Sequence, residues 1–424
     1  MTKTTERNIL VYADWIGLPK PARVGTLFAT PTRHSEIFSF EYDINWLRND
    51  KTHTLDPALQ AVSGRQYPGQ TQNNFGLFLD SSPDRWGRFL MNRRTAEQAR
   101  EQQTVLKPLR ESDYLLGVYD AYRAGALRFK LDEHGPFLDN QKNLAAPPWT
   151  SLRAIEQASF AIEKKGAEEK KSYQKWLNML IAPGGSLGGA RPKACVLDEK
   201  NHPWIAKFPS HKDEYDLGAW EMVTHQLAKR AGILTPEARL EQFQHHHHTF
   251  LSKRFDRKCF DQRIHFASAV TLLQRHDGDD ASVGASYLEL AEFIMQFGAN
   301  VEEDLSQLWR RIVFNMCVSN VDDHLRNHGF IFQPGRGWKL SPAYDMNPDP
   351  LGDGLKLNIS ETDNAQHLAL AKDVAPYFRM NVKNANQTIK QVISAVRQWQ
   401  SIAKQLKIPR QEQMQMAAAF RVVE

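Results

Sequence analysis

The first 45 residues alternate apolar and polar positions in the way that short β-strands do. Ile9–Tyr12 and Val24–Leu27 are compact apolar runs, and Glu36–Tyr42 repeats with a period of two residues. We therefore expect a small α/β unit at the start of the chain. A helix is expected over Ser82–Arg94, with Ser82 as its N-cap and Pro83 in its first turn. Packing between domains is favoured over catalysis as the role of the Trp and Arg residues in this segment.

The middle of the chain predicts two helices and a hairpin. Ser151–Ile162 has a helical pattern, and the mixed charge run 163–171 after it is interpreted as a solvated face or linker, because its signs cancel. Tyr215–Arg230 also predicts a helix, which Gly232 would end. His245–His248 lie between two strand-like runs, so we interpret them as a hairpin turn and not as a metal site.

Helical periodicity dominates from about residue 260 onward. Asp304–Val318 carries an apolar stripe that predicts a core-facing helix; it comprises Leu305, Leu308, Ile312 and Met316. Two strands, His328–Phe332 and Gly337–Leu340, are expected around a tight turn at Gln333–Arg336. Thr388–Leu406 predicts one amphipathic helix that packs on the rest of this region, without a function of its own.

Composition limits the class of protein without indicating its chemistry. The 424 residues are 41% hydrophobic and 24% charged, with a formal net charge of +5. These values disfavour a disordered or fibrous chain, and the mild positive excess permits contact with phosphates without demanding it. Charges interrupt every apolar run well before the roughly 18 residues of a membrane span, and the N-terminus lacks a signal-peptide core. Three widely spaced cysteines disfavour a disulfide scaffold or zinc site, so we expect a reducing cytoplasm.

A glycine-rich segment is the first sign of chemistry. Ala182–Ala190 holds four glycines and a serine, and glycine lets a backbone turn its amides toward phosphate oxygens. The segment lacks the Walker pattern, but two strand-like runs follow it, Ala194–Leu197 and Trp204–Phe208. Lys207 is expected in the middle of the second strand, where a charged side chain needs an anionic partner or a path to solvent. We favour a nucleotide phosphate over an edge lysine that reaches solvent.

The next helix adds a residue type that protein kinases use. In kinases a strand lysine pairs with a helix glutamate, which orients it on the nucleotide phosphates. Lys207 and Glu221 occur here in that order. A plain surface position for Glu221 is an equal alternative.

The most specific pattern is Ser319–Asn327, directly after the helix at 304–318. Asp322 and Asn327 are separated by four residues, as in the kinase catalytic loop. Phosphoryl transfer needs a carboxylate to accept a hydroxyl proton and oxygen ligands for Mg²⁺. Asp345 follows the 328–340 hairpin, where kinases place a metal-binding aspartate, although Asp345-Met-Asn347 replaces D-F-G. Asp322 or Asp323 alone could instead cap a turn, but the ordered set is not expected by chance.

These motifs resemble the HipA family of bacterial serine/threonine kinase toxins of type II toxin–antitoxin systems. The resemblance covers nearly the whole chain, and it rests on Pro83–Arg88, Ser186–Lys193, Arg254–Arg257, Asn320–Asn327 and Tyr344–Asp345. It implies an α+β, two-lobed, protein-kinase-like fold. The implied domains are an N-terminal α/β subdomain over residues 1–145, a small lobe over 146–256 and a mostly helical large lobe over 257–424.

The resemblance also implies a role for individual residues toward ATP and Mg²⁺. Asp322 would be the catalytic base, Lys207 would hold phosphates, Asn327 and Asp345 would ligate Mg²⁺, and Ser186 would be autophosphorylated. The residues that would cover the nucleotide are Gly188, Gly189, Ala190, Arg191, Pro192 and Lys193. Further nucleotide contacts would come from Lys253, Arg254, Phe255, His324, Asn327, Tyr344 and Asp345. Lys253 departs from the family, which often has an acidic residue there.

The partners implied by the resemblance are proteins. They are a helix-turn-helix antitoxin of HipB type, through which DNA would be contacted only indirectly, and a substrate such as an aminoacyl-tRNA synthetase. Two alternatives stay open: a catalytically weak regulator that binds a DNA-binding partner, and a small-molecule kinase of the same fold.

Overall fold

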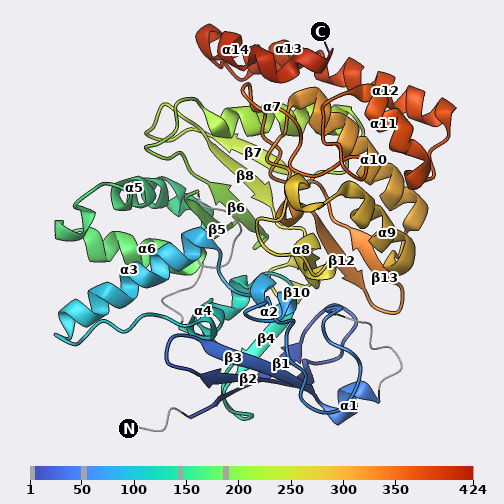
Figure 1. The fold of residues 1–424 in the computed structure, drawn as a ribbon. Coiled ribbons are helices and arrows are strands. Elements are labelled where there is room, and N and C mark those ends of the chain that lie inside the picture. The colour runs from blue at the N-terminus through green and yellow to red at the C-terminus, as the bar shows by residue number, and fades with distance from the viewer. Residues whose placement is uncertain (1–4, 49–54, 142–146, 185–190, 424) are drawn as a thin grey trace. The chain divides into compact units, whose positions relative to one another are not determined.

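The computed structural model describes residues 5–48, 55–141, 147–184 and 191–423. The chain divides into two compact units, shown in Figure 1. The N-terminal unit comprises Met1–His211 and Asp256–Ala267, and the C-terminal unit comprises Lys212–Phe255 and Ser268–Glu424. The division into three domains stays a prediction.

An antiparallel sheet in the order β3-β2-β1-β4 begins the N-terminal unit. Its strands are β1 (Arg7–Ala13), β2 (Ala22–Pro31), β3 (Glu36–Tyr42) and β4 (Leu127–Lys130). The three strands expected before residue 45 are therefore confirmed. The side chain of Phe40 in β3 lies 5.5 Å from that of Phe78, measured between ring centroids, so the buried face of the sheet packs on α2. The short helices beside this sheet are α1 (Ile44–Leu47) and α2 (Gly76–Asp80).

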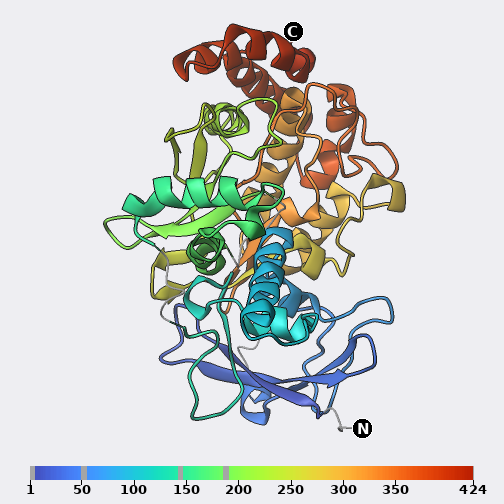
Figure 2. The same cartoon turned by 90° about the vertical axis from the view of Figure 1, so that its left-hand side faces the viewer.

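Four longer helices also belong to the N-terminal unit, which Figure 2 shows from another side. They are α3 (Arg85–Glu101), α4 (Glu111–Leu116), α5 (Leu152–Ile162) and α6 (Tyr173–Gly184). The expected N-cap of α3 is wrong by two residues. Asp84 caps the helix, because its carboxylate accepts the Gly87 amide at 3.1 Å. Ser82 instead donates its hydroxyl to the Phe78 carbonyl at the end of α2.

A β-hairpin follows the glycine-rich segment, as expected. It consists of β5 (Lys193–Leu197) and β6 (Pro203–Lys207), and α6 packs against β5. Lys207 is the last residue of β6 and not its middle. The strand ends there because Pro209, two residues on, has no amide hydrogen to continue a ladder. A second small hairpin in this unit pairs β9 (Arg257–Cys259) with β10 (Gln262–Arg263), and β11 (Phe266–Ser268) follows.

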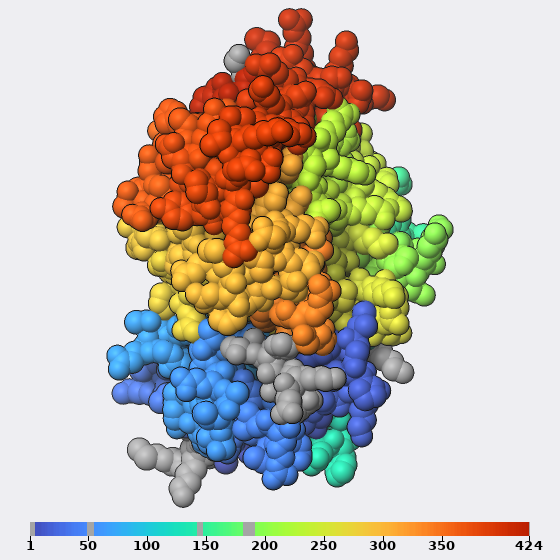
Figure 3. Space-filling view, turned by 90° about the vertical axis from the view of Figure 1, so that its right-hand side faces the viewer, coloured from blue at the N-terminus to red at the C-terminus, as the bar shows by residue number. Residues whose placement is uncertain are grey.

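The C-terminal unit is built around α10 (Val301–Val318). Its predicted apolar stripe is fully buried, and α9 (Tyr287–Phe297) and α12 (Val382–Val396) pack against it. The strands expected after it form the hairpin of β12 (Gly329–Gln333) and β13 (Gly337–Leu340). The remaining helices are α7 (Leu217–Arg230), α8 (Ala269–Leu272), α11 (Leu368–Val374), α13 (Trp399–Gln405) and α14 (Arg410–Met416). Figure 3 shows their C-terminal members in red on the surface.

The predicted histidine turn is confirmed. β7 (Ala238–Glu241) and β8 (Thr249–Lys253) pair antiparallel, and His245–His248 lie between them. The Nδ1 atom of His248 lies 2.5 Å from the carboxylate of Asp216, which caps α7.

The single helix expected over Thr388–Leu406 is wrong, because the chain breaks it into α12 and α13 at Arg397–Gln398. The break lets Trp399 stack on Phe420, with ring centroids 4.5 Å apart and an interplanar angle of 8°. Within the described part of the chain, no helix is long and apolar enough to cross a membrane.

The α10 stripe should carry much of the stability of the C-terminal unit. Replacing the fully buried Ile312 by Ala is expected to lower the free energy of unfolding by about 2–5 kcal/mol, since it removes apolar contacts and leaves a cavity. Urea denaturation would measure the change. Leu351→Ala is the control, because Leu351 is 91% exposed and should change stability little. Equal effects of the two substitutions would contradict this account of the core.

Candidate active site

The segment Asn320–Asn327, predicted to be a catalytic loop and called the catalytic loop below, takes its position from the way α10 ends. Ser319 adopts the left-handed region with φ of 47°, and its amide bonds back to the carbonyl of Asn315. The Asn320 amide bonds to the same carbonyl at 2.9 Å. These bonds satisfy carbonyls at the end of the helix and turn the chain sharply away from its axis.

Asp322 presents its carboxylate to solvent from this turn. Its side chain is exposed and makes no hydrogen bond to any residue of the described ranges. Its backbone carbonyl, in contrast, accepts the His324 amide at 2.9 Å and the Asn327 side-chain amide at 3.0 Å. An accessible carboxylate on a fixed backbone suits a general base, the role predicted for Asp322.

The neighbouring Asp323 is buried, a difference from Asp322 that no local pattern predicts. Its Oδ2 atom accepts hydrogen bonds from the Tyr287 hydroxyl at 2.6 Å and from Asn315 Nδ2 at 2.7 Å, and His328 Nε2 lies 2.8 Å away. Burial opposes the charge, but the charge of His328 and the hydrogen bonds from His328 and Tyr287 hold the pKa of Asp323 below its ordinary value. Asp323 is therefore a buried structural anion and more than a turn cap.

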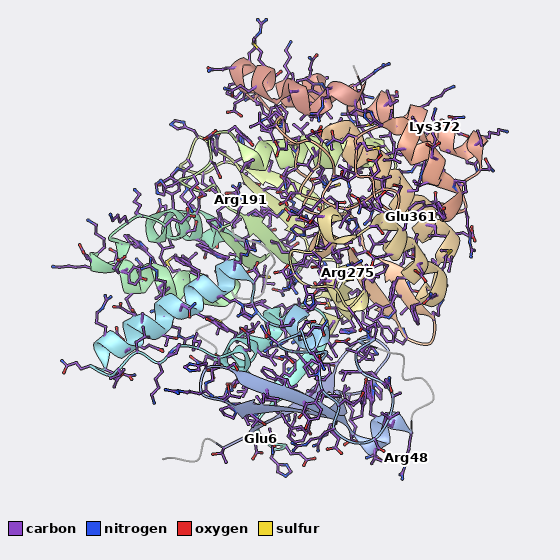
Figure 4. The ribbon with its side chains drawn as sticks, in the orientation of Figure 1. Glu6, Arg48, Arg191, Arg275, Glu361 and Lys372 are labelled. Carbon is purple, nitrogen blue, oxygen red and sulfur yellow. The ribbon has the colours of Figure 1, made fainter. Side chains whose placement is uncertain are left out.

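Tyr287 reaches Asp323 because the start of α9 is firmly capped. Ser286 and Glu289 form a capping box at this end of the helix. Arg275, labelled in Figure 4, also pairs with Glu289 at 2.7 Å.

Asn327 and Asp345, the predicted Mg²⁺ ligands, lie on segments that a hydrogen bond joins. The hydroxyl of Tyr344 donates to the carbonyl of Arg326 at 2.8 Å, and each of these residues precedes one predicted ligand. Asn327 is buried and uses its side-chain nitrogen to hold Asp322, so its amide oxygen is the atom suited to a cation.

The donor set of these two residues fits Mg²⁺. An amide oxygen and a carboxylate are hard oxygen ligands of the kind that this cation takes. Asp345 is half-buried with φ of 58°, in the left-handed region that Asp tolerates better than most residues. Asn347 donates its side-chain amide to Asp345 Oδ1 at 3.3 Å. The metal role of both residues stays a prediction.

Two predicted nucleotide contacts also meet in the C-terminal unit. The rings of Phe255 and Tyr344 lie 5.6 Å apart between centroids. Arg254 is buried, and His324 is half-buried. The Lys253 ammonium lies 3.7 Å from the Glu237 carboxylate, so its side chain is directed at a protein anion.

A plain surface position for Glu221 is wrong, because this side chain on α7 is buried. Its pairing with Lys207 stays a prediction.

The N-terminal unit holds the other predicted phosphate ligands. Lys193, the first residue of β5, is buried and lies directly opposite Lys207 in the hairpin. Its ammonium lies 3.7 Å from the Asp84 carboxylate, and its carbonyl accepts the Trp86 indole N–H at 3.1 Å. Burial raises the pKa of Asp84 to about 6, with the positive charge of Lys193 acting in the opposite direction.

The other predicted residues around the glycine-rich segment are only partly described. Arg191, labelled in Figure 4, and Pro192 come just before β5. Ser186, Gly188, Gly189 and Ala190 lie outside the described residues. Of the Trp and Arg residues of 82–94, Trp86 is buried and Arg88 forms two hydrogen bonds of 2.6 Å to Glu111; their role in packing between domains stays a prediction.

Sequence comparison matches part of the chain to a known protein family. Residues 185–400, more than half of the chain, match the HipA-like C-terminal domain. The chain is 29% identical over 180 residues to "Putative kinase" of Haemophilus influenzae, covering 38% of this chain and 52% of that protein. It is 25% identical over 221 residues to "Putative kinase Y4dM" of Sinorhizobium fredii, covering 44% and 49%. The chain thus spans about half the length of the curated relatives it matches.

The fold is similar to that of a solved toxin–antitoxin structure. A chain in the complex of HipA, HipB and operator DNA from Shewanella oneidensis MR-1 superimposes with a TM-score of 0.63 at 15% identity, covering 98% of this chain and 95% of that chain. This likeness confirms the expected α+β, HipA-like fold.

The Asp323 cluster predicts a pH-dependent stability. A carboxylate with a lowered pKa stabilises the fold at pH values above its ordinary pKa, and this contribution is lost as the pH falls through the folded-state pKa. Tyr287→Phe removes one donor, so it should lower the free energy of unfolding at pH 7 by about 1–3 kcal/mol. The difference from the wild type should shrink as both proteins protonate in acid.

Denaturation at several pH values would measure this difference. Tyr377→Phe is the matched control, because Tyr377 is 56% exposed and the same atom is removed. A Tyr287→Phe protein as stable as this control at pH 7 would contradict the role of the cluster.

Proposed function

The chain belongs to the HipA-like C-terminal domain family, and we propose that it is an ATP- and Mg²⁺-dependent serine/threonine protein kinase. One arrangement carries the proposal: the exposed Asp322 carboxylate lies on the same loop as Asn327, and a hydrogen bond joins this loop to the segment of Asp345. Transfer of the γ-phosphoryl group uses a base for the attacking hydroxyl and oxygen ligands for Mg²⁺, and these three residues can supply both.

In the proposed reaction Asp322 orients the hydroxyl of the substrate and accepts its proton as the oxygen attacks the γ-phosphorus, whose bond to the bridging oxygen of the β-phosphate breaks to release ADP. Asn327 and Asp345 hold Mg²⁺, which when bound neutralises charge on the phosphate oxygens. Lys207, Lys193 and Arg191 bind phosphates through their positive charges. Phe255 and Tyr344 supply an apolar contact for adenine, because aromatic faces stack on nucleobases.

Regulation and partners are part of the same proposal. Phosphorylation of Ser186 would add negative charge to a loop that faces ATP phosphates, and like charges disfavour that loop conformation. The Shewanella oneidensis structure contains HipB and operator DNA, which supports an antitoxin of HipB type as partner. DNA contact only through that partner is proposed from the family resemblance. An aminoacyl-tRNA synthetase is the proposed substrate, on the basis of the family resemblance.

Removing the proposed base should abolish most of the activity. Asp322→Asn is expected to lower the rate of protein phosphorylation about 10²–10⁴-fold, the usual contribution of general base catalysis. Transfer of labelled phosphate from Mg·ATP to protein would measure it. Asp353→Asn, at an exposed position of the same unit, is the matched control and should be unchanged. Unchanged labelling by Asp322→Asn would exclude the base assignment and favour a regulator that acts by binding its partner.

The proposed regulation predicts phosphate on the glycine-rich segment. After incubation with saturating Mg·ATP, mass spectrometry of wild-type protein should find the peptide that contains Ser186 phosphorylated, and Asp322→Asn should lack this phosphate. A labelled second protein with an unmodified Ser186 peptide would contradict autophosphorylation. Phosphate found only on a metabolite would identify a small-molecule kinase.

A further inference from the structure

A series of side-chain amides links the catalytic loop to the segment that carries Asp345. Asn315 donates to Asp323 at 2.7 Å, and its oxygen accepts Asn320 Nδ2 at 3.1 Å. Asn320 Oδ1 accepts the backbone N–H of Asn347 at 3.2 Å, and the Asn347 side chain donates to Asp345 at 3.3 Å. We call Asn315, Asn320 and Asn347 the amide relay.

The two ends of the amide relay fix the orientation of the amides between them. The Asp323 oxygen accepts other donors as well as Asn315, and the backbone N–H of Asn347 can only donate. Asn315 and Asn320 must therefore both direct their nitrogen atoms toward Asp323. Turning either amide over would place oxygen against oxygen and nitrogen against nitrogen.

Burial makes this orientation costly to lose. Asn315 is 3% exposed and Asn320 is 1% exposed, so water has little access to replace a missing partner. A buried polar group without a partner lowers the stability of the fold by more than one hydrogen bond normally adds to it.

The backbone of Asp345 needs this support. A non-glycine residue with φ of 58° persists where surrounding contacts determine its conformation. Asn347 contacts the Asp345 carboxylate with its side chain and Asn320 with its backbone amide. Asn320 thus anchors the segment in which Asp345 adopts this conformation.

We propose that Asn320 is a positioning residue that orients Asp345 for binding a divalent cation. The inference rests on the proposed kinase function, in which Asp345 is a metal ligand. Asn320 itself touches neither the cation nor the nucleotide. It acts through Asn347, as the outer contacts of metal sites orient the ligands.

Asn320→Asp tests this role while keeping the size of the side chain. The new oxygen would face the Asn315 oxygen, whereas the acceptor for Asn347 is retained. With ADP present, the affinity for Mn²⁺, used as a probe for Mg²⁺, should fall about 10–100-fold, the usual effect of losing an outer contact of a metal site. Electron paramagnetic resonance would measure free Mn²⁺. The Mg²⁺ concentration at half-maximal phosphorylation should rise by a similar factor, with kcat largely restored at saturating Mg²⁺.

The double variant Asn320→Asp/Asp323→Asn separates positioning from general damage. In this variant the side chain at position 323 can donate a hydrogen bond and the side chain at position 320 can only accept one. Asn315 can therefore turn its amide over, accept from position 323 and donate to position 320. An amide nitrogen at position 323 has two hydrogens, so it can donate to Asn315 and to the Tyr287 hydroxyl, which can accept as well as donate. The double variant should regain most of the Mn²⁺ affinity that Asn320→Asp loses. This comparison decides the question even if Asn320→Asp alone does not fold, because a folded double variant without Mn²⁺ affinity would overturn the proposal.

Two further proteins serve as controls for Mn²⁺ binding. Asn384→Asp makes the same chemical change at an exposed position, and Ile312→Ala lowers stability without removing a partner of the relay; both should bind Mn²⁺ as the wild type does. If Asn320→Asp folds and also binds Mn²⁺ with wild-type affinity, the positioning role is excluded while the kinase function stands. If the wild type itself binds no Mn²⁺ with ADP and transfers no phosphate, the proposed function fails and the inference with it.

Discussion

The buried carboxylate of Asp323 is the charge around which the C-terminal unit organises its candidate active site. An ion inside a protein costs several kcal/mol of desolvation, so it persists only where its partners are well placed. Here the partners are Tyr287 at the start of α9, Asn315 in the last turn of α10 and His328 just before β12. Satisfying one carboxylate therefore fixes the relative positions of three elements.

This constraint explains how two adjacent aspartates acquire different properties. The turn that carries Asp323 into the interior leaves Asp322 exposed, with its backbone carbonyl held by Asn327. A base must reach its substrate, whereas a structural anion must be shielded from water and surrounded by donors. The same functional group can serve either need, and only its surroundings decide which.

The N-terminal unit must also accommodate a buried charge, that of Lys193 just after the glycine-rich segment. The hairpin register places Lys193 opposite Lys207, and like charges on facing positions of two strands repel. Asp84, the N-cap of α3, supplies a negative charge near Lys193, and Trp86 holds its carbonyl. The Pro83–Arg88 motif thus holds Lys193, three residues after the glycine-rich segment, although the two lie more than 100 residues apart in the sequence.

Strands, helix faces and turns that depend only on residues close together in the chain could be predicted from the sequence. The alternation of Glu36–Tyr42 predicted β3 to the residue, the stripe of α10 predicted its buried face, and the turn residues predicted the hairpins, because periodicity and turn chemistry are local properties. The spacing of Asp322 and Asn327 predicts a catalytic loop from the sequence alone, and this role stays a prediction. The N-cap at Asp84, the break at Arg397–Gln398 and the burial of Asp323 were decided only by tertiary structure. Each depends on distant partners: Lys193 pairs with Asp84, Phe420 stacks on Trp399, and Tyr287 bonds to Asp323, and no local pattern encodes those contacts.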